Sequence, residues 1–105
     1  MTKFILGFAA AFSLSVGFVL SGDPTYNCHA YAWTADKVWL DTPPLQSATE
    51  VSSGPIVVYF DGDTPIHSGK YLGYGLVKSK WGPKPVIYHP IYLSPYGRNV
   101  KFYGR

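Results

Sequence analysis

Cys28 is the single cysteine of a 105-residue chain, and it stands directly after an asparagine. One cysteine excludes an intramolecular disulfide framework and any multi-cysteine zinc site. Asn27 is a suitable N-cap, so we expect a helix that begins at Cys28. Backbone amides and the helix dipole at that position lower the pKa of a thiol and make it a better nucleophile. Cys28 is therefore a candidate for covalent catalysis; a buried small side chain or an intermolecular disulfide are the alternatives.

Three histidines could accept the proton of that thiol. His67 begins a predicted strand further along the chain, and the small residues beside it leave room for a substrate. His29 follows Cys28 directly and so points about 100° round the helix, away from the thiol. His89 is either the group that orients the base or an ordinary side chain at a strand end. We therefore predict a Cys28–His67 pair with His89 as a candidate third member.

One helix and several short strands would have to position these residues. The helix is predicted from Cys28 to Lys37 or beyond, because Tyr31, Ala35 and Val38 share one face. Residues 41–54, rich in Pro, Ser and Thr, are predicted to form a loop. Strands are expected at residues 55–60, 66–72, 75–79, 84–89 and 99–103. This order predicts an α+β fold in which the helix packs on one face of a small antiparallel sheet.

The part of the chain after residue 22 is too short to bury a thick core, so a few large side chains must supply it. The residues expected there are Trp33, Val38, Trp39, Ile56, Val58, Leu72, Leu76, Val86 and Ile87.

The first 22 residues differ in composition from the rest. Lys3 precedes an apolar run over residues 4–20 and then small residues, which is typical of a secretion signal. An uncleaved anchor is the alternative, and it would give membrane association through residues 4–20. On either interpretation residues 23–105 form one exported domain, and we expect a secreted or periplasmic location.

Charge is unevenly distributed along the chain. No acidic residue follows Asp63, whereas seven basic residues do. This asymmetry indicates either a solvated basic face or attraction to an anionic partner such as a cell-wall polymer or lipid headgroups. No nucleic-acid partner is expected, because neither a recognition-helix pattern nor zinc-finger spacing is present.

Several motifs resemble those of the CHAP and NlpC-type cysteine peptidases and amidases. Residues 27–33 (NCHAYAW) are similar to the nucleophile helix of that family, and residues 54–59 (GPIVVY) to the strand that follows it. Residues 66–73 (IHSGKYLG) resemble the strand that carries the base, and residues 77–82 and 88–90 resemble later strands. The resemblance extends over residues 24–104.

The resemblance implies a papain-like core, with an N-terminal helix packed on an antiparallel sheet of four to five strands. It also implies acyl transfer without a metal or cofactor. Cys28 would attack an amide carbonyl, and His67 would take the thiol proton and pass it to the leaving amine. Backbone amides at the start of the helix would stabilise the oxyanion.

The resemblance further implies a substrate class, which is peptidoglycan or another anionic substrate that contains amides. The third catalytic residue would be His89 or Ser79, or it would be absent. Residues expected to contact the substrate are Tyr31 and Trp81.

Two other functions fit the same sequence. A non-catalytic module could bind the cell wall or a glycan through surface aromatic residues, namely Tyr71, Tyr74, Trp81, Tyr92 and Tyr96. A small amidase-type toxin or effector could use the same hydrolytic centre on a protein, for example on glutamine side chains.

Overall fold

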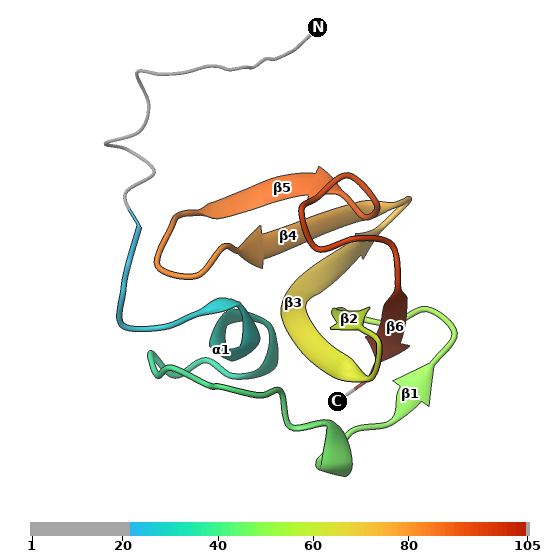
Figure 1. Ribbon diagram of the computed structural model, residues 1–105, viewed down its shortest axis with the longest axis horizontal. Helices are drawn as coiled ribbons and strands as arrows, with labels where there is room; N and C mark the ends of the chain where they lie inside the picture. The colour runs from blue at the N-terminus through green and yellow to red at the C-terminus, as the bar shows by residue number, and fades with distance from the viewer. Residues whose placement is uncertain (1–21, 105) are drawn as a thin grey trace, which may run out of the picture.

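The computed structural model describes residues 22–104, so the predicted leader lies outside the described residues except for Gly22. One six-stranded antiparallel sheet is the main element of the described chain (Figure 1). The helices are α1 (Cys28–Trp33) and the short 3₁₀ helix η1 (Leu45–Ser47). The strands are β1 (Glu50–Val51), β2 (Ile56–Asp61), β3 (Thr64–Gly73), β4 (Leu76–Lys80), β5 (Val86–Pro90) and β6 (Val100–Tyr103).

The strand order across the sheet is β1-β6-β2-β3-β4-β5, and all neighbours are antiparallel. Strand β3 is long and strongly curved, as Figure 1 shows. Its residues from Thr64 to Lys70 pair with β2, whereas pairing with β4 begins only at Lys70, opposite Lys78. The first half of β3 therefore has no partner strand on the β4 side.

Alternate residues of β2 supply two separate apolar clusters, because successive side chains of a strand point to opposite faces. Ile56, Val58 and Phe60 pack with Ala32 and Trp33 of α1. On the other face, a second cluster is built from Val57, Tyr59, Val77 and Ile91, with Tyr71, Tyr96, Val100 and Phe102 against it. β2 is thus buried on both sides in the centre of the molecule.

The papain-like α+β fold predicted from the sequence is wrong. Helix α1 has only six residues and ends at Thr34, whose backbone is extended. Ala35 and Val38 were expected to continue its apolar face, but both are exposed. A helix so short cannot form a layer over the sheet, which itself has six strands because β1 and β6 close one edge. Residues 41–54 were predicted to form a loop, and this prediction missed η1 and β1. Elements this short carry too little periodicity to be recognised in a sequence.

The expected core is correct in part. Trp33, Ile56 and Val58 are buried, and Val86 and Ile87 are half-buried. The other four expected residues are exposed, namely Val38, Trp39, Leu72 and Leu76. The fold instead buries Tyr59, His67 and Ser68, which were not expected in the core. No helix among residues 22–104 has the length and apolar character needed to cross a bilayer.

Asn27 connects the start of α1 to the segment that follows the helix. Its Oδ1 accepts from the amides of Ala30 (3.2 Å) and Leu40 (3.3 Å), and its Nδ2 donates to the Leu40 carbonyl (2.6 Å). The Asn27 side chain is buried. Removing it would leave the amides of Ala30 and Leu40 and the Leu40 carbonyl without a hydrogen-bond partner.

We expect Asn27→Ala to lower the free energy of unfolding by about 2 kcal/mol or more, since it removes a cap and two further hydrogen bonds. Urea unfolding followed by circular dichroism measures this. Ser47→Ala is the matched control, because the hydroxyl of Ser47 makes one exposed hydrogen bond and its loss should change stability by less than about 0.5 kcal/mol. Equal effects of the two substitutions would show that Asn27 does not hold the helix start.

Candidate active site

Cys28 is the first residue of α1, and its side chain is only 7% exposed. Burial raises the pKa of the thiol, while the backbone amides of Ser68, His29 and Cys28 itself act in the opposite direction as hydrogen-bond donors. The positive charge of Lys80 also lowers this pKa, with the smallest effect. The predicted lowering of the thiol pKa is therefore wrong, because the effect of burial exceeds that of the backbone amides and the lysine.

The amide of Ser68 is available to the thiol because of the way β3 is paired. Tyr71 donates its amide to the Pro55 carbonyl on the β2 side (2.8 Å), so odd-numbered amides of β3 point to β2. The Ser68 amide points to the opposite side, where pairing with β4 has not yet begun. Cys28 therefore lies beside the backbone of β3 at the residue that follows His67.

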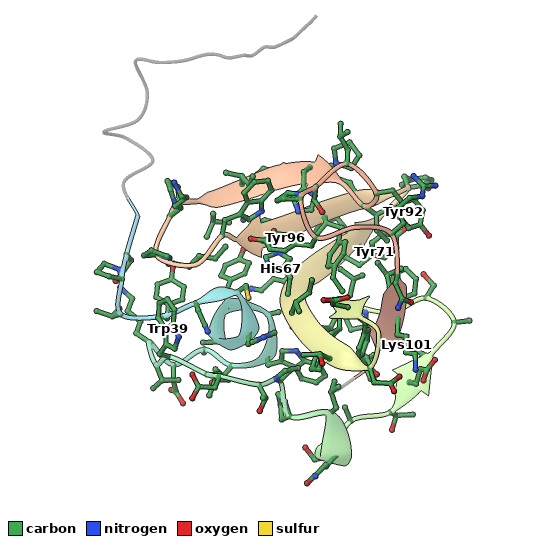
Figure 2. All side chains as sticks on the ribbon, in the orientation of Figure 1. Trp39, His67, Tyr71, Tyr92, Tyr96 and Lys101 are labelled. Carbon is green, nitrogen blue, oxygen red and sulfur yellow. The ribbon has the colours of Figure 1, made fainter. Side chains whose placement is uncertain are left out.

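His67 is 1% exposed and lies beneath an aromatic ring. The ring of Tyr96 stacks on it with a centroid distance of 3.7 Å and an interplanar angle of 5°. Figure 2 shows the two side chains together where α1, β3 and β4 meet. Neither ring nitrogen of His67 has a hydrogen-bond partner among the described residues. Burial, followed by the nearby His89 and His29, lowers the pKa of His67 to about 3, so the imidazole is neutral at neutral pH.

Tyr96 connects His67 with Cys28. Its pKa is raised, first by burial and then by the proximity of a charge on Cys28. The residue belongs to the segment between β5 and β6, so one side chain of this segment covers the imidazole and lies near the thiol. In the sequence it was grouped with surface aromatics, and only its position in the fold assigns it to the site.

His29 is engaged elsewhere. The indole N–H of Trp33 donates to the hydroxyl of Ser68 (3.2 Å), which leaves the Ser68 hydrogen to donate to Nδ1 of His29 (2.7 Å). Burial lowers the pKa of His29 to about 4, which is consistent with a neutral ring that accepts this bond. His29 is thus a structural partner of Ser68.

His89 makes the same kind of contact in β5. The indole N–H of Trp81 donates to Ser79 Oγ (3.0 Å), and Ser79 and His89 Nε2 are 2.9 Å apart. The other ring nitrogen, Nδ1, donates to the Pro90 carbonyl (2.9 Å). His89 therefore contacts Ser79 and not the ring of His67, although it is close enough for its charge to lower the His67 pKa. His89 and Ser79, the two residues considered for the third catalytic position, thus bond to each other.

The two side chains expected to contact substrate have different surroundings. Tyr31 is half-buried, lies beneath the ammonium of Lys70 (4.3 Å) and lines a cavity of about 220 Å³ whose charged residues are Lys70, Lys37 and Asp36. Trp81 instead packs edge-on against His89 and Tyr96, at centroid distances of 5.7 and 5.6 Å. Tyr31 thus faces an open cavity, and Trp81 supports the histidine cluster.

Lys80 fixes the segment that leads into Cys28. Its ammonium donates to the carbonyls of Asp23 and Gly82 and lies 4.5 Å from the centre of the Tyr26 ring. The residue is almost fully buried, and burial lowers its pKa. The approach to α1 is therefore attached to the end of β4.

Open cavities lie elsewhere on the molecule. One of about 670 Å³ is lined by residues 42–47, which do not include Cys28 or His67. No group of three His, Cys, Asp or Glu side chains within residues 22–104 could hold a metal ion. Cys28 and His67 are both buried, and no hydrogen bond joins the thiol to either nitrogen of the imidazole.

No family model, curated protein or solved structure matches this chain. The motifs quoted from the sequence therefore remain the basis of the resemblance to cysteine peptidases and amidases.

The buried neutral histidines should make the fold sensitive to acid. Folded His29 and His67 have pKa values of about 4 and about 3, below the ordinary value of 6.5. Their contribution to stability is complete above pH 6.5 and is lost as the pH falls towards 3. Each should lower the free energy of unfolding by about 1.4 kcal/mol per pH unit between about pH 6 and pH 4. Urea unfolding across this range measures the slope.

His67→Phe is the matched variant, because it retains a ring beneath Tyr96 but cannot bind a proton. Its slope should be shallower than that of the original chain by about 1.4 kcal/mol per pH unit. Parallel slopes would contradict the assignment of His67 as a buried neutral group.

Closure by Tyr96 can be tested through the thiol. We expect iodoacetamide to react slowly with Cys28 at neutral pH, because the thiol is buried and its pKa is raised. Tyr96→Ala should accelerate the reaction by about tenfold or more by opening the cover. Tyr92→Ala is the control, since Tyr92 lies in the same segment and is exposed. Mass spectrometry measures the rate, and equal rates for both variants would show that Tyr96 does not close the site.

Proposed function

We propose that the protein is a secreted or periplasmic cysteine hydrolase that cleaves amide bonds, with peptidoglycan as its substrate. Cys28 is the nucleophile and His67 the general base and acid. The observation that carries the proposal is the buried imidazole of His67, which has no hydrogen-bond partner among the described residues at either nitrogen. The amide of the next residue, Ser68, faces the Cys28 thiol. Leaving such nitrogens unpaired costs about 1–3 kcal/mol, which purely structural histidines such as His29 and His89 avoid.

The surroundings of the thiol are suited to acyl transfer. As the Cys28 sulfur bonds to the amide carbonyl carbon, its proton passes to His67, and the carbonyl oxygen becomes an oxyanion. Backbone amides around the sulfur can donate to the charge that develops there. The C–N bond then breaks as His67 returns the proton to the leaving amine. Water, deprotonated by His67, hydrolyses the thioester and restores the thiol.

This chemistry requires the segment between β5 and β6 to move. In the closed conformation thiol and imidazole are both neutral, and Tyr96 covers His67. Displacement of Tyr96 would let water and substrate reach the pair, and the pKa of His67 would rise towards its ordinary value as the ring becomes solvated. A base with a pKa nearer 7 is the more effective proton acceptor.

The cavity beside Tyr31 supports an acidic substrate. Tyr31 lies one turn after Cys28 on α1, and its ring and the Lys70 ammonium line this cavity. A carboxylate of a peptide stem could pair with Lys70 while its amide bond lies at the helix start. The local motif NCHAYAW supports the same substrate class through its resemblance to the CHAP and NlpC-type nucleophile helix.

The test is cleavage of purified peptidoglycan fragments, with products identified by mass spectrometry. Cys28→Ser should abolish turnover, and His67→Phe should reduce it by about a hundredfold or more, because each removes one partner of the proton transfer. Ser47→Ala, on the remote 3₁₀ helix, should retain full activity. Full activity of the Cys28→Ser chain would overturn the proposal. Loss of glutamine amide nitrogen from added protein, without cleavage of peptidoglycan, would retain the chemistry but assign a protein substrate.

A further inference from the structure

Large apolar side chains are exposed together at one end of the sheet. They come from the turn between β3 and β4 and from the segment directly after β5. We call this group the apolar tip, and its members are Leu72, Tyr74, Leu76, Tyr92 and Leu93. Tyr74 is fully exposed and Leu93 is 72% exposed. Exposed apolar groups that cluster in this way mark interaction sites more often than singly scattered ones.

The two segments of the apolar tip are held side by side. Leu76 is the register partner of Pro90, and the amide of Ile91 donates to the Gly75 carbonyl (2.8 Å). Figure 2 shows Tyr92 at this end of the sheet and Trp39 on the opposite side of the molecule. The five side chains thus form one surface at the end of the β3–β4 hairpin.

The turn itself is built to present Tyr74. Gly73, Tyr74 and Gly75 all have positive φ, at 91°, 54° and 75°. The Gly75 amide donates to the hydroxyl of Tyr71 (2.9 Å), which fixes the turn. Tyr74 is the one described residue other than glycine in the left-handed region, a conformation that is unfavourable for bulky residues. Glycine or asparagine would adopt this conformation more easily than tyrosine, so the exposed ring is retained at a cost to the stability of the turn.

Basic residues lie directly behind the apolar tip. Lys70 and Lys78 are register partners in β3 and β4, each two residues from a leucine of the tip, and Lys78 shares a face with Leu76. Like charges directly opposite one another destabilise a sheet. The ion pair found among residues 22–104 joins Lys37 to Asp23, so neither lysine has a carboxylate partner in that part of the chain.

The charge around the tip is of one sign. The Arg98 guanidinium lies 4.6 Å from the centre of the Tyr92 ring. Asp61, the last residue of β2, and Asp63 lie at the other end of β3, whereas Asp36 lines the cavity beside Tyr31 together with Lys70. This end of the molecule therefore combines exposed apolar side chains with basic residues that form no ion pair within residues 22–104.

We propose that the apolar tip inserts into the interfacial region of a bilayer that contains anionic lipids, with Lys70, Lys78 and Arg98 at the headgroup phosphates. Tyr and Leu side chains suit this region, and lysine stems extend along apolar surface to place the ammonium among headgroups. A projecting hairpin end needs no complementary cavity to enter a bilayer, whereas a protein partner would have to supply one. The proposal does not require the chemistry at Cys28, but it shares Lys70 with the cavity beside Tyr31.

A position-specific probe separates insertion of the tip from any contribution of residues 1–22. Leu93→Cys is introduced into the full chain carrying Cys28→Ser and labelled with an environment-sensitive fluorophore. Vesicles of phosphatidylcholine with phosphatidylglycerol should at least double the emission and shift it to shorter wavelength. Trp39→Cys, labelled in the same way on the opposite side, is the control and should change little. A similar change at both positions, or none at Leu93, would overturn the proposal.

The charge contribution is tested with Lys70→Gln combined with Lys78→Gln. Because each basic residue contributes about 1 kcal/mol near an anionic surface, the pair should weaken vesicle binding at the Leu93 probe about 30-fold. Lys84→Gln combined with Lys101→Gln removes the same charge elsewhere and should have a much smaller effect. Equal weakening by both pairs would contradict a specific basic surface. An equal response of the Leu93 probe to vesicles of pure phosphatidylcholine would contradict a requirement for anionic lipid. Tighter binding of soluble polygalacturonate than of vesicles, with the same dependence on the two lysines, would overturn the lipid as the partner.

Discussion

Ser68 is the residue on which the arrangement of the candidate site depends. Its hydroxyl is the point where α1 meets β3, since it accepts from Trp33 and bonds to His29, both on the helix. Its amide faces the thiol of Cys28. The curvature of β3, which delays pairing with β4 until Lys70, leaves that amide free of the sheet. One fully buried serine thus fixes the position of a six-residue helix that could not be stable alone.

The same chemical unit occurs twice, and His67 stands between the two. Ser68 with His29 and Trp33, and Ser79 with His89 and Trp81, each satisfy a buried hydroxyl, an indole N–H and an imidazole nitrogen. Among the three histidines, His67 alone has both ring nitrogens buried without a hydrogen-bond partner among the described residues. Because burial lowers the pKa of both neighbouring histidines, His29 and His89 are neutral at neutral pH and offer His67 neither a proton nor a counter-charge. This contrast is the reason for assigning reactivity to His67.

The described residues place two different surfaces at different parts of one sheet. The buried thiol and imidazole lie at α1 and the first half of β3, whereas the apolar tip lies at the end of the β3–β4 hairpin, and Lys70 between them contacts the ring of Tyr31 on α1. Strand β3 connects them, since it carries His67 and Ser68 in its first half and Lys70 and Leu72 in its second. A soluble substrate does not require the second surface, but a hydrolase held at an envelope would use both.

The sequence by itself determined the local features that depend on near neighbours. Asn27 as N-cap, the start of the helix at Cys28 and the strands near residues 56, 66, 76, 86 and 100 follow from capping chemistry, β-branched runs and glycine turns. The tertiary structure alone decided the length of the helix, the six-stranded sheet and the exposure of Leu72 and Leu76. It also decided that Tyr96 covers His67 and that the Cys28 thiol has a raised pKa. These properties are set by burial and by residues distant in the chain, and neither periodicity nor spacing records which side chains lose contact with water.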